Sequence, residues 1–238
     1  MKKFSVVIPC YNEESTLAAV VENVLKLASS QLALEVIIVD DCSKDKSRAV
    51  AGRLADAHPE VKVVFHEVNR GKGASLQTGF RVATGDYVGV QDADLEYNPC
   101  DYLRMIDALE TWDVDVVFGS RYLGHENRPV LRWWHSSTNR FLTFLSNVFS
   151  DLDLTDMETC YKLFRREVIA KIAPSLRESR FGFEPEIVAR LAHTMRAEGW
   201  RMREVSIDYR PRTFSEGKKI GPLDGLRALY CIVRYNLF

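Results

Sequence analysis

Short runs of apolar, mostly β-branched residues alternate with longer helical patterns along the first half of this 238-residue chain. The predicted strands are Phe4–Ile8, Glu35–Val39, Val61–His66, Asp86–Val90 and Asp115–Phe118. The predicted helices between them include Glu14–Ala28, Asp45–Ala57 and Ala74–Ala83. Strands joined by helices pair in parallel, because a parallel connection needs a crossover of about a dozen residues or more. The alternation therefore predicts an α/β fold with a mostly parallel central sheet flanked by helices.

A different pattern begins near Gly124. The stretch Leu131–Phe149 is amphipathic and rich in aromatic residues. Three arginines accompany it: Arg128, Arg132 and Arg140. Its residues Trp133 and Trp134 suit a membrane interface, although a helix buried in the core explains the same spacing. Both interpretations stay open at this point.

The remainder of the chain predicts a helix opening at Pro185, a strand over Glu204–Tyr209 and a basic tail from Arg210. We find no internal repeat, low-complexity tract or linker in the sequence. We therefore expect a single domain spanning residues 1–238, with a change of character between its halves, 1–123 and 124–238.

Charge and cysteine content exclude several classes of protein. The 32 Lys and Arg residues balance 33 Asp and Glu, which argues against a dedicated nucleic-acid binder. Five widely spaced cysteines form neither a metal motif nor a disulfide framework, so we expect a reducing cytosol. The apolar run after Met1 is too short for a signal peptide. The longest uncharged run, Phe141–Ser150, is about half of what a membrane-spanning helix needs.

Polar side chains follow each predicted strand, and ligands of open α/β sheets bind outside the carboxyl ends of the strands. The segments are Pro9-Cys10-Tyr11-Asn12-Glu13, Asp40-Asp41-Cys42-Ser43, Asn69-Arg70-Gly71-Lys72-Gly73, Asp92-Ala93-Asp94 and Gly119-Ser120-Arg121-Tyr122. Taken singly, each is explained by a turn or a helix cap. Their joint placement at five strand ends favours a binding site instead.

The residue types in these segments suit a nucleoside diphosphate. Asp92 and Asp94 flank one small residue, so both carboxylates can reach one Mg²⁺ or Mn²⁺ ion. Glu96 either adds an oxygen or is a surface charge. Lys72, in a glycine-flanked loop, can reach a phosphate, and Asp40 or Asp41 can accept hydrogen bonds from a base or ribose.

Other nucleotide folds and hydrolases fit poorly. The segment Gly71-Lys72-Gly73-Ala74-Ser75-Leu76 begins like a dinucleotide fingerprint, but it lacks the third glycine and follows the third strand. The sequence has no GxxxxGK[ST] phosphate loop and no GxSxG nucleophile elbow. A sugar nucleotidyltransferase, the nearest rival, typically opens with a glycine-rich loop, whereas Pro9-Cys10-Tyr11-Asn12-Glu13 contains no glycine.

The ordered motifs resemble those of the family 2 glycosyltransferases of GT-A fold. The likeness rests on Val6-Val7-Ile8-Pro9-Cys10-Tyr11-Asn12-Glu13-Glu14, Val39-Asp40-Asp41-Cys42-Ser43, Asn69-Arg70-Gly71-Lys72-Gly73, Asp92-Ala93-Asp94 and Gly119-Ser120-Arg121-Tyr122. It covers roughly residues 4–220. Within the family, the sequence is most similar to dolichyl-phosphate and polyprenyl-phosphate glycosyltransferases, such as mannose synthases. Those mannose synthases usually have Gln where this chain has Glu96, which leaves the sugar open.

The resemblance implies a role for each motif. The nucleotide-binding residues would be Pro9, Tyr11, Asn12, Glu13, Asp40, Asp41, Lys72 and Asp92. The metal site, for Mg²⁺ or Mn²⁺, would comprise Asp92, Asp94 and Glu96. The acceptor phosphate would be held by Arg121, Arg212 and Lys218, although a solvated basic tail explains the last two equally well. The central catalytic residues would be Asp92, Asp94 and Arg121, and the halves 1–123 and 124–238 would bind nucleotide and acceptor respectively.

The expected activity is an inverting, metal-dependent hexosyl transfer from a GDP- or UDP-sugar to a polyprenyl or dolichyl phosphate. A lipid phosphate is ionised near neutral pH, so its oxygen attacks without a general base. An alternative acceptor is a saccharide hydroxyl, with Asp156 or Glu158 as base. A non-catalytic scaffold that binds nucleotide-sugars is the alternative of another class.

Many family members carry transmembrane helices, so here either a partner or the amphipathic stretch would anchor the enzyme on the cytoplasmic face of the membrane.

Overall fold

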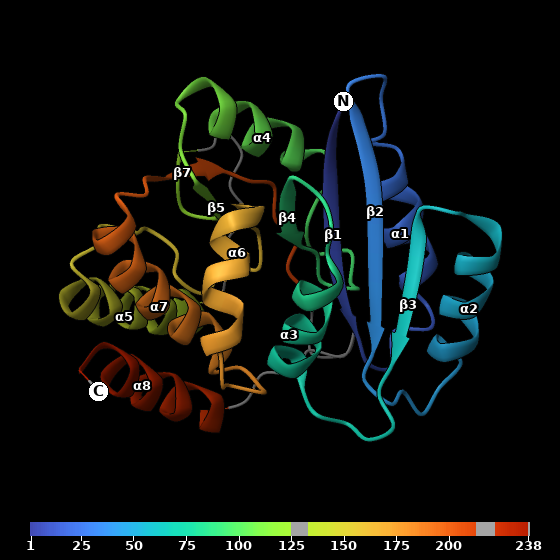
Figure 1. Cartoon of the computed structure of the whole chain (residues 1–238). Coiled ribbons are helices and arrows are strands. Elements are labelled where there is room, and N and C mark those ends of the chain that lie inside the picture. The colour runs from blue at the N-terminus through green and yellow to red at the C-terminus, as the bar shows by residue number, and fades with distance from the viewer. Residues whose placement is uncertain (125–132, 213–221, 238) are drawn as a thin grey trace.

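A computed structural model describes residues 1–124, 133–212 and 222–237 of the chain. Its centre is a seven-stranded sheet, counted over these residues, with strand order β3-β2-β1-β4-β6-β5-β7. The strands are β1 (Lys2–Cys10), β2 (Leu32–Asp40), β3 (Val61–Phe65), β4 (Tyr87–Val90), β5 (Val116–Ser120), β6 (Lys162–Arg165) and β7 (Met202–Ser206). The expected α/β fold with a mostly parallel sheet is confirmed (Figure 1).

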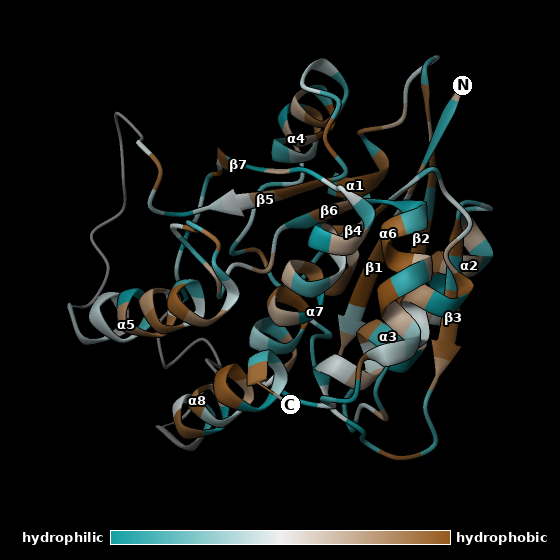
Figure 2. Ribbon diagram, turned by 60° about the vertical axis from the view of Figure 1, so that its left-hand side comes forward, coloured by the Kyte–Doolittle hydropathy of each residue, from teal (hydrophilic) through white to brown (hydrophobic). Residues whose placement is uncertain are grey.

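Helices flank the sheet on both sides. They are α1 (Leu17–Leu25), α2 (Ser47–Ala57), α3 (Lys72–Val82), α4 (Asp101–Thr111), α5 (Trp133–Ser150), α6 (Arg166–Ile172), α7 (Phe183–Glu198) and α8 (Pro222–Leu237), with a 3₁₀ turn η1 at Ala173–Ser175. Figure 2 shows α3, α6 and α7 along one face. Strands β1 and β2 are buried through most of their length, which is why they read as near-continuous apolar runs.

Strand β6 departs from the predicted pattern. It runs antiparallel to both β4 and β5, pairing Val88 with Phe164 and Val117 with Leu163. Its four residues lie between two longer helices, too short a run for periodicity to reveal. The sequence analysis therefore did not predict this strand or the helix α6 after it.

Several element boundaries also differ from expectation. Helix α1 begins at Leu17 and not at Glu14, and α3 begins at Lys72 and not at Ala74. Strand β7 lies at Met202–Ser206, earlier than the predicted Glu204–Tyr209. The tail expected to be a basic, interrupted segment includes the helix α8, which packs against α5 and α7.

The strand order creates a crevice beside β1. The chain moves outward on one side through β2 and β3, then crosses to place β4 on the other side of β1. At such a reversal, the loops that follow neighbouring strands diverge and leave an opening at the carboxyl ends. The end of β1 and the loop after it carry Pro9–Glu13, and the segment after β4 carries Asp92–Asp94. This topology positions the candidate site.

Three stacked tyrosines support the floor of this crevice. The ring of Tyr161 stacks on Tyr97 and Tyr102, with centroids 4.7 and 4.5 Å apart. The Tyr161 hydroxyl donates to Gln91 Oε1 at 2.6 Å, and the Tyr97 hydroxyl accepts from the backbone of Cys160 at 3.2 Å. The stack therefore fixes the end of β4 against the segment that leads into β6.

Candidate active site

A cavity of about 430 Å³ opens at the carboxyl ends of the strands. Most residues predicted from sequence line it: Pro9, Tyr11, Glu13, Asp41, Lys72, Asp92, Asp94, Glu96, Arg121 and Arg212. Lys218 lies outside the described residues. Asn12 and Asp40 are described but do not line the cavity. The fold thus gathers into one volume side chains from positions 9 to 212 of the chain.

The two aspartates that follow β4 are each paired with a cation. Lys72 Nζ lies 3.0 Å from Asp92 Oδ1, and Arg212 Nη2 lies 2.9 Å from Asp94 Oδ2. Burial favours the neutral acid at Asp92, but Lys72 outweighs it and lowers the pKa of that carboxyl. Asp92 therefore carries a full negative charge at neutral pH.

Glu96 interacts with the chain segment after β7. Its Oε2 accepts a hydrogen bond from the Tyr209 hydroxyl at 2.9 Å, and its Oε1 accepts one from the Arg212 backbone at 2.7 Å. Its backbone carbonyl accepts a third from Arg210 at 2.8 Å. The structure therefore places Glu96 beside Asp94, with its carboxylate holding the segment Tyr209–Arg212 against the cavity.

Arg121 is fixed by a buried carboxylate. Its guanidinium makes two parallel bonds to Asp156, with Nε 2.7 Å from Oδ2 and Nη2 2.8 Å from Oδ1. Asn139 donates to the same carboxylate at 2.9 Å. The guanidinium also lies 5.1 Å from the ring centroid of Tyr209. Arg121 therefore presents a rigid positive charge to the cavity, and Asp156 is occupied in holding it there.

The loop after β3 is organised by Asp41. The backbone N–H groups of Arg70 and Gly71 donate to the two Asp41 oxygens at 2.8 and 2.7 Å, and His66 Nδ1 lies 2.8 Å from Oδ1. Gly71 has a φ of +95°, and a Cβ there would collide with the backbone carbonyl of Ser179. Only glycine fits this turn, which brings Lys72 to the cavity as the first residue of α3.

Asn12 and Asp40 support neighbouring loops. Asn12 has a positive φ of 54°, and its side-chain oxygen accepts from the backbone of Lys44 at 2.7 Å. Asp40 is fully buried, and its Oδ2 accepts from the Ser43 backbone at 3.3 Å. Asn12 therefore joins the loops that follow β1 and β2, and Asp40 holds the loop that follows β2. Asn12 and Asp40 therefore support the loops that form the cavity and do not line it.

Buried charges underlie the cavity floor. Lys72 bridges Asp92 and Glu184, whose Oε1 is 3.2 Å from its Nζ. Burial lowers the pKa of Lys72, but the two carboxylates outweigh it and raise that pKa above its usual range. Glu158 also lines the cavity, and its buried Oε1 has no hydrogen-bond partner. Burial, reinforced by Glu184, raises the pKa of Glu158 to about 7.

Several cavity residues were not predicted from sequence. They are Ser75, Tyr97, Cys160, Arg180, Phe181, Glu184 and Tyr209. Arg180 and Phe181 lie on the connection that packs over Gly71 and leads into α7. The sequence does indicate that Glu184 lies in the first turn of a helix, because acidic residues are favoured at helix N-termini. Nothing in the local sequence marks Tyr209 or Arg180.

The pair Asp92 and Asp94 provides the donor atoms that a hard divalent cation prefers. Within the three described stretches, no cluster of three or more His, Cys, Asp or Glu side chains has the geometry of a complete metal site. A cation at this pair would take its remaining ligands from water or phosphate. This donor set fits Mg²⁺ or Mn²⁺ bound together with a diphosphate.

Comparison with known proteins agrees with this geometry. The domain described as Glycosyl transferase family 2 matches residues 5–173. The chain belongs to the family 2 glycosyltransferases. This match extends from within β1 through β6 and α6 and includes the aspartate pair, Arg121 and Asp156.

Curated relatives of this family 2 glycosyltransferase share between a quarter and a third of its residues. Glycosyltransferase AglD of Haloferax volcanii is 27% identical over 87% of the chain, and dolichyl-phosphate beta-glucosyltransferase ALG5A of Trichomonas vaginalis is 29% identical over 86%. A dolichyl-phosphate beta-glucosyltransferase of Dictyostelium discoideum is 27% identical over 92%. The chain spans 33%, 65% and 68% of the lengths of these three relatives.

Solved structures show the same fold. Glucosyl-3-phosphoglycerate synthase from Mycobacterium tuberculosis, crystallised with Mn²⁺, uridine diphosphate and glucosyl-3-phosphoglycerate, superposes with a TM-score of 0.71. The match covers 98% of this chain and 80% of the synthase at 18% sequence identity. The expected GT-A architecture is thereby confirmed for this glycosyltransferase.

Proposed function

We propose that this family 2 glycosyltransferase moves a hexose from a nucleoside diphosphate sugar to a polyprenyl phosphate at a membrane surface. The observation that carries the proposal is that one cavity contains both a pair of carboxylates and a fixed guanidinium. A carboxylate pair, Asp92 and Asp94, suits a metal-bound diphosphate, and the immobilised guanidinium of Arg121 suits a second, separate phosphate. An uncharged saccharide hydroxyl brings no anionic group for that guanidinium to bind.

The donor would be held along one side of the cavity. Pro9, Tyr11 and Glu13 form the wall after β1, where we place the nucleoside. Lys72, at the N-terminus of α3, would contact the diphosphate, since a helix N-terminus and a cation both favour negative charge. Asp92 and Asp94 would hold Mg²⁺ or Mn²⁺, which when bound neutralises charge on the departing nucleoside diphosphate.

The acceptor phosphate would lie beside Arg121. Held there, one of its oxygens attacks the anomeric carbon, the bond from that carbon to the diphosphate oxygen breaks, and the configuration inverts. The protein contributes by positioning and by fixed charge, because Asp156 keeps the guanidinium oriented before the acceptor arrives. The phosphate is already ionised, so no proton has to be removed.

The names of the relatives guide the choice of donor. Two of them are dolichyl-phosphate beta-glucosyltransferases, and the solved synthase holds uridine diphosphate. We therefore propose UDP-glucose as the first donor, ahead of GDP-mannose. The test incubates the protein with Mn²⁺, each sugar nucleotide and a short polyprenyl phosphate, and measures glycolipid and nucleoside diphosphate. Metal-dependent glycolipid supports the proposal; release of nucleoside diphosphate without glycolipid contradicts the lipid acceptor.

A hydroxyl acceptor is the second candidate, and Glu158 is the observation that favours it. Its carboxyl lines the cavity, has an oxygen without a partner and has a pKa near 7. With a saccharide hydroxyl as acceptor, we expect the rate to rise with pH through about 7, as Glu158 loses its proton, and Glu158→Gln to abolish that rise. With a lipid phosphate, Glu158→Gln leaves the pH profile unchanged. Rates measured from pH 5 to 9 with both acceptors distinguish the two functions.

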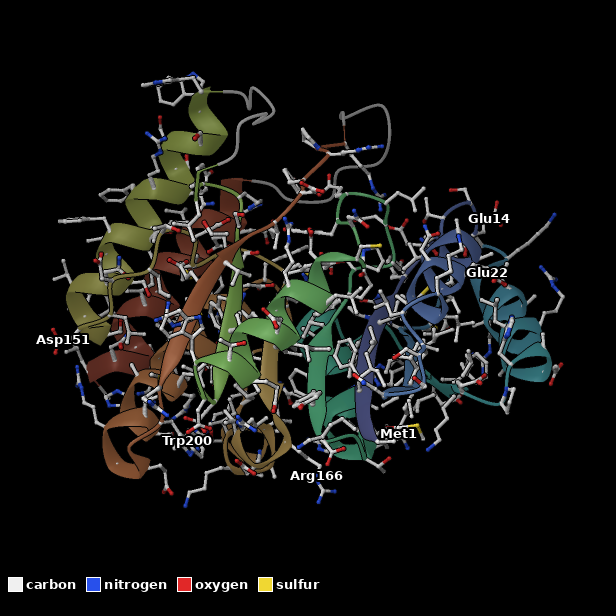
Figure 3. All side chains as sticks on the ribbon, turned by 90° about the horizontal axis from the view of Figure 1, so that it is seen from above. Met1, Glu14, Glu22, Asp151, Arg166 and Trp200 are labelled. Carbon is white, nitrogen blue, oxygen red and sulfur yellow. The ribbon has the colours of Figure 1, made fainter. Side chains whose placement is uncertain are left out.

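An exposed apolar surface supports action at a membrane. We call this surface the α5–α8 face; its residues are Trp133, Trp134, Phe141, Phe144 and Val148 of α5, and Leu226, Tyr230, Val233 and Leu237 of α8. The two helices lie side by side, and Figure 2 shows hydrophobic residues along both. In Figure 3, where Asp151 marks the end of α5, side chains project outward from this helix. No helix in the described part of the chain is long and apolar enough to span a bilayer.

Replacing Trp133 and Trp134 with alanine is expected to weaken binding to anionic vesicles by about tenfold or more, because each buries a large ring at the interface. Their side chains are 68% and 74% exposed, so folding should not suffer. The measurement is vesicle co-sedimentation, with tryptophan fluorescence as a second readout. Trp112→Ala is the matched control, since Trp112 is also exposed but lies at the end of α4. Fluorescence that vesicles leave unchanged contradicts membrane binding.

A further inference from the structure

Arg212 holds a central place among the cavity carboxylates. Its guanidinium lies 2.9 Å from Asp94 Oδ2 and 3.3 Å from Glu13 Oε2. Its side chain is mostly buried, at 16% exposure. The same residue was expected to bind the acceptor phosphate. As the structure stands, that positive charge is engaged with the carboxylates of the donor side.

Asp94 has both carboxylate oxygens engaged. Oδ2 faces Arg212, and Oδ1 accepts a hydrogen bond from the backbone of Glu96 at 3.0 Å. A divalent cation that coordinates Oδ2 competes with the guanidinium for that oxygen. Two like charges within a few ångströms also repel each other strongly in a partly buried site. Arg212 and a metal ion are therefore alternative partners of Asp94.

The backbone of Arg212 is anchored independently of its side chain. Glu96 accepts hydrogen bonds from the backbone of Arg212 at 2.7 Å and from the hydroxyl of Tyr209 at 2.9 Å. The Tyr209 ring in turn lies under the guanidinium of Arg121. A guanidinium released from Asp94 would remain tethered at this wall of the cavity, on the segment that also supports Arg121.

We propose that Arg212 couples the two binding steps of the reaction: a metal-bound donor displaces its guanidinium from Asp94, and the released charge then binds the acceptor phosphate together with Arg121. This inference rests on the proposed function. It imposes an order, because an acceptor that arrives first meets an Arg212 already neutralised by Asp94 and Glu13. The residue thus positions the acceptor only after the donor is in place.

The first test is Mn²⁺ affinity at saturating UDP, measured by electron paramagnetic resonance of free Mn²⁺, with no acceptor and no turnover. Arg212→Ala is expected to tighten Mn²⁺ binding about tenfold, because a competitor for Asp94 is removed. Arg180→Ala is the matched control: Arg180 lines the same cavity and carries the same charge, but lies beside Gly71. Equal tightening in both variants, or none in Arg212→Ala, overturns the coupling.

The second test measures the coupling itself. In the native protein, Mn²⁺ and UDP together should strengthen binding of a short polyprenyl phosphate, and Arg212→Ala should remove that enhancement. Arg212→Lys keeps the positive charge but loses the planar set of N–H donors, so it should retain part of the enhancement. This variant replaces Arg212→Ala in the test if the alanine variant fails to fold. Acceptor affinity that is independent of Mn²⁺ and UDP in the native protein contradicts the proposed order. If the native protein binds no Mn²⁺ at saturating UDP, the metal dependence in the proposed function is contradicted. That result is distinct from a failure of the coupling, in which Mn²⁺ binds but does not affect acceptor affinity.

Discussion

Replacing Asp94 with alanine is expected to lower the rate of sugar transfer by about 10³-fold while the protein remains folded. The carboxylate is one of two oxygen donors available for the cation, and charge stabilisation of a leaving group is typically worth several kcal/mol of the barrier. Its side chain is 18% exposed, and Arg212 keeps Glu13 as a counter-ion at 3.3 Å when Asp94 is removed, so the fold should survive the change. The measurement is kcat with Mn²⁺, UDP-glucose and a short polyprenyl phosphate, alongside circular dichroism.

The same variant separates an enzyme from a scaffold. A non-catalytic protein that binds nucleotide-sugars has no turnover to lose, and its interaction with a membrane partner should not change in Asp94→Ala. The matched control is Asp107→Ala, because Asp107 is an exposed aspartate on α4, away from the cavity. Transfer that persists in Asp94→Ala at the native rate would remove Asp94 from the metal site.

Replacing Asp156 with alanine is expected to destabilise the protein by about 3–5 kcal/mol, because it leaves the guanidinium of Arg121 buried without its counter-ion. Asp156 is fully buried, which by itself raises the pKa of its carboxyl. The positive charge of Arg121 outweighs this effect and lowers that pKa below its usual value. The measurement is urea-induced unfolding at pH 7. Asp56→Ala, at an exposed aspartate within α2, is the control and should change stability by less than about 0.5 kcal/mol.

A double variant shows whether Asp156 acts through Arg121. Replacing both members with apolar residues, Asp156→Leu with Arg121→Met, removes the unpaired charge, so much of the lost stability should return. Activity should not return, because the acceptor phosphate has lost its fixed cation. A double variant as unstable as Asp156→Ala would show that the carboxylate's bonds to Asn139 and the Arg121 backbone matter more than the ion pair.

The acidic pH dependence of stability follows from the same pair. The pKa of Asp156 lies below its usual value in the folded protein, so its contribution is present above the unfolded pKa, near 4. That contribution is lost as the pH falls through the folded pKa. The Arg121–Asp156 pair therefore stabilises the protein throughout the neutral range in which the transferase would work.

The sequence by itself determined the fold class and the position of the site. Short runs rich in β-branched residues, such as Phe4–Ile8, favour buried strands, and helices between such strands favour parallel pairing. Polar segments that follow such strands must meet at one edge. Asp92, Asp94, Lys72 and Arg121 could thus be assigned to one site before any contact was known.

The tertiary structure decided which partners these residues have. Asp156 and Glu158 looked equivalent as bases in sequence, but Asp156 is bound to Arg121 and Glu158 faces the cavity. Arg212 lies far along the chain from Asp94, and Glu184 and Tyr209 reach the cavity through long-range packing. Local periodicity reports which face of an element is buried, whereas partnership between distant charged groups depends on how the elements pack, and only the folded chain specifies that.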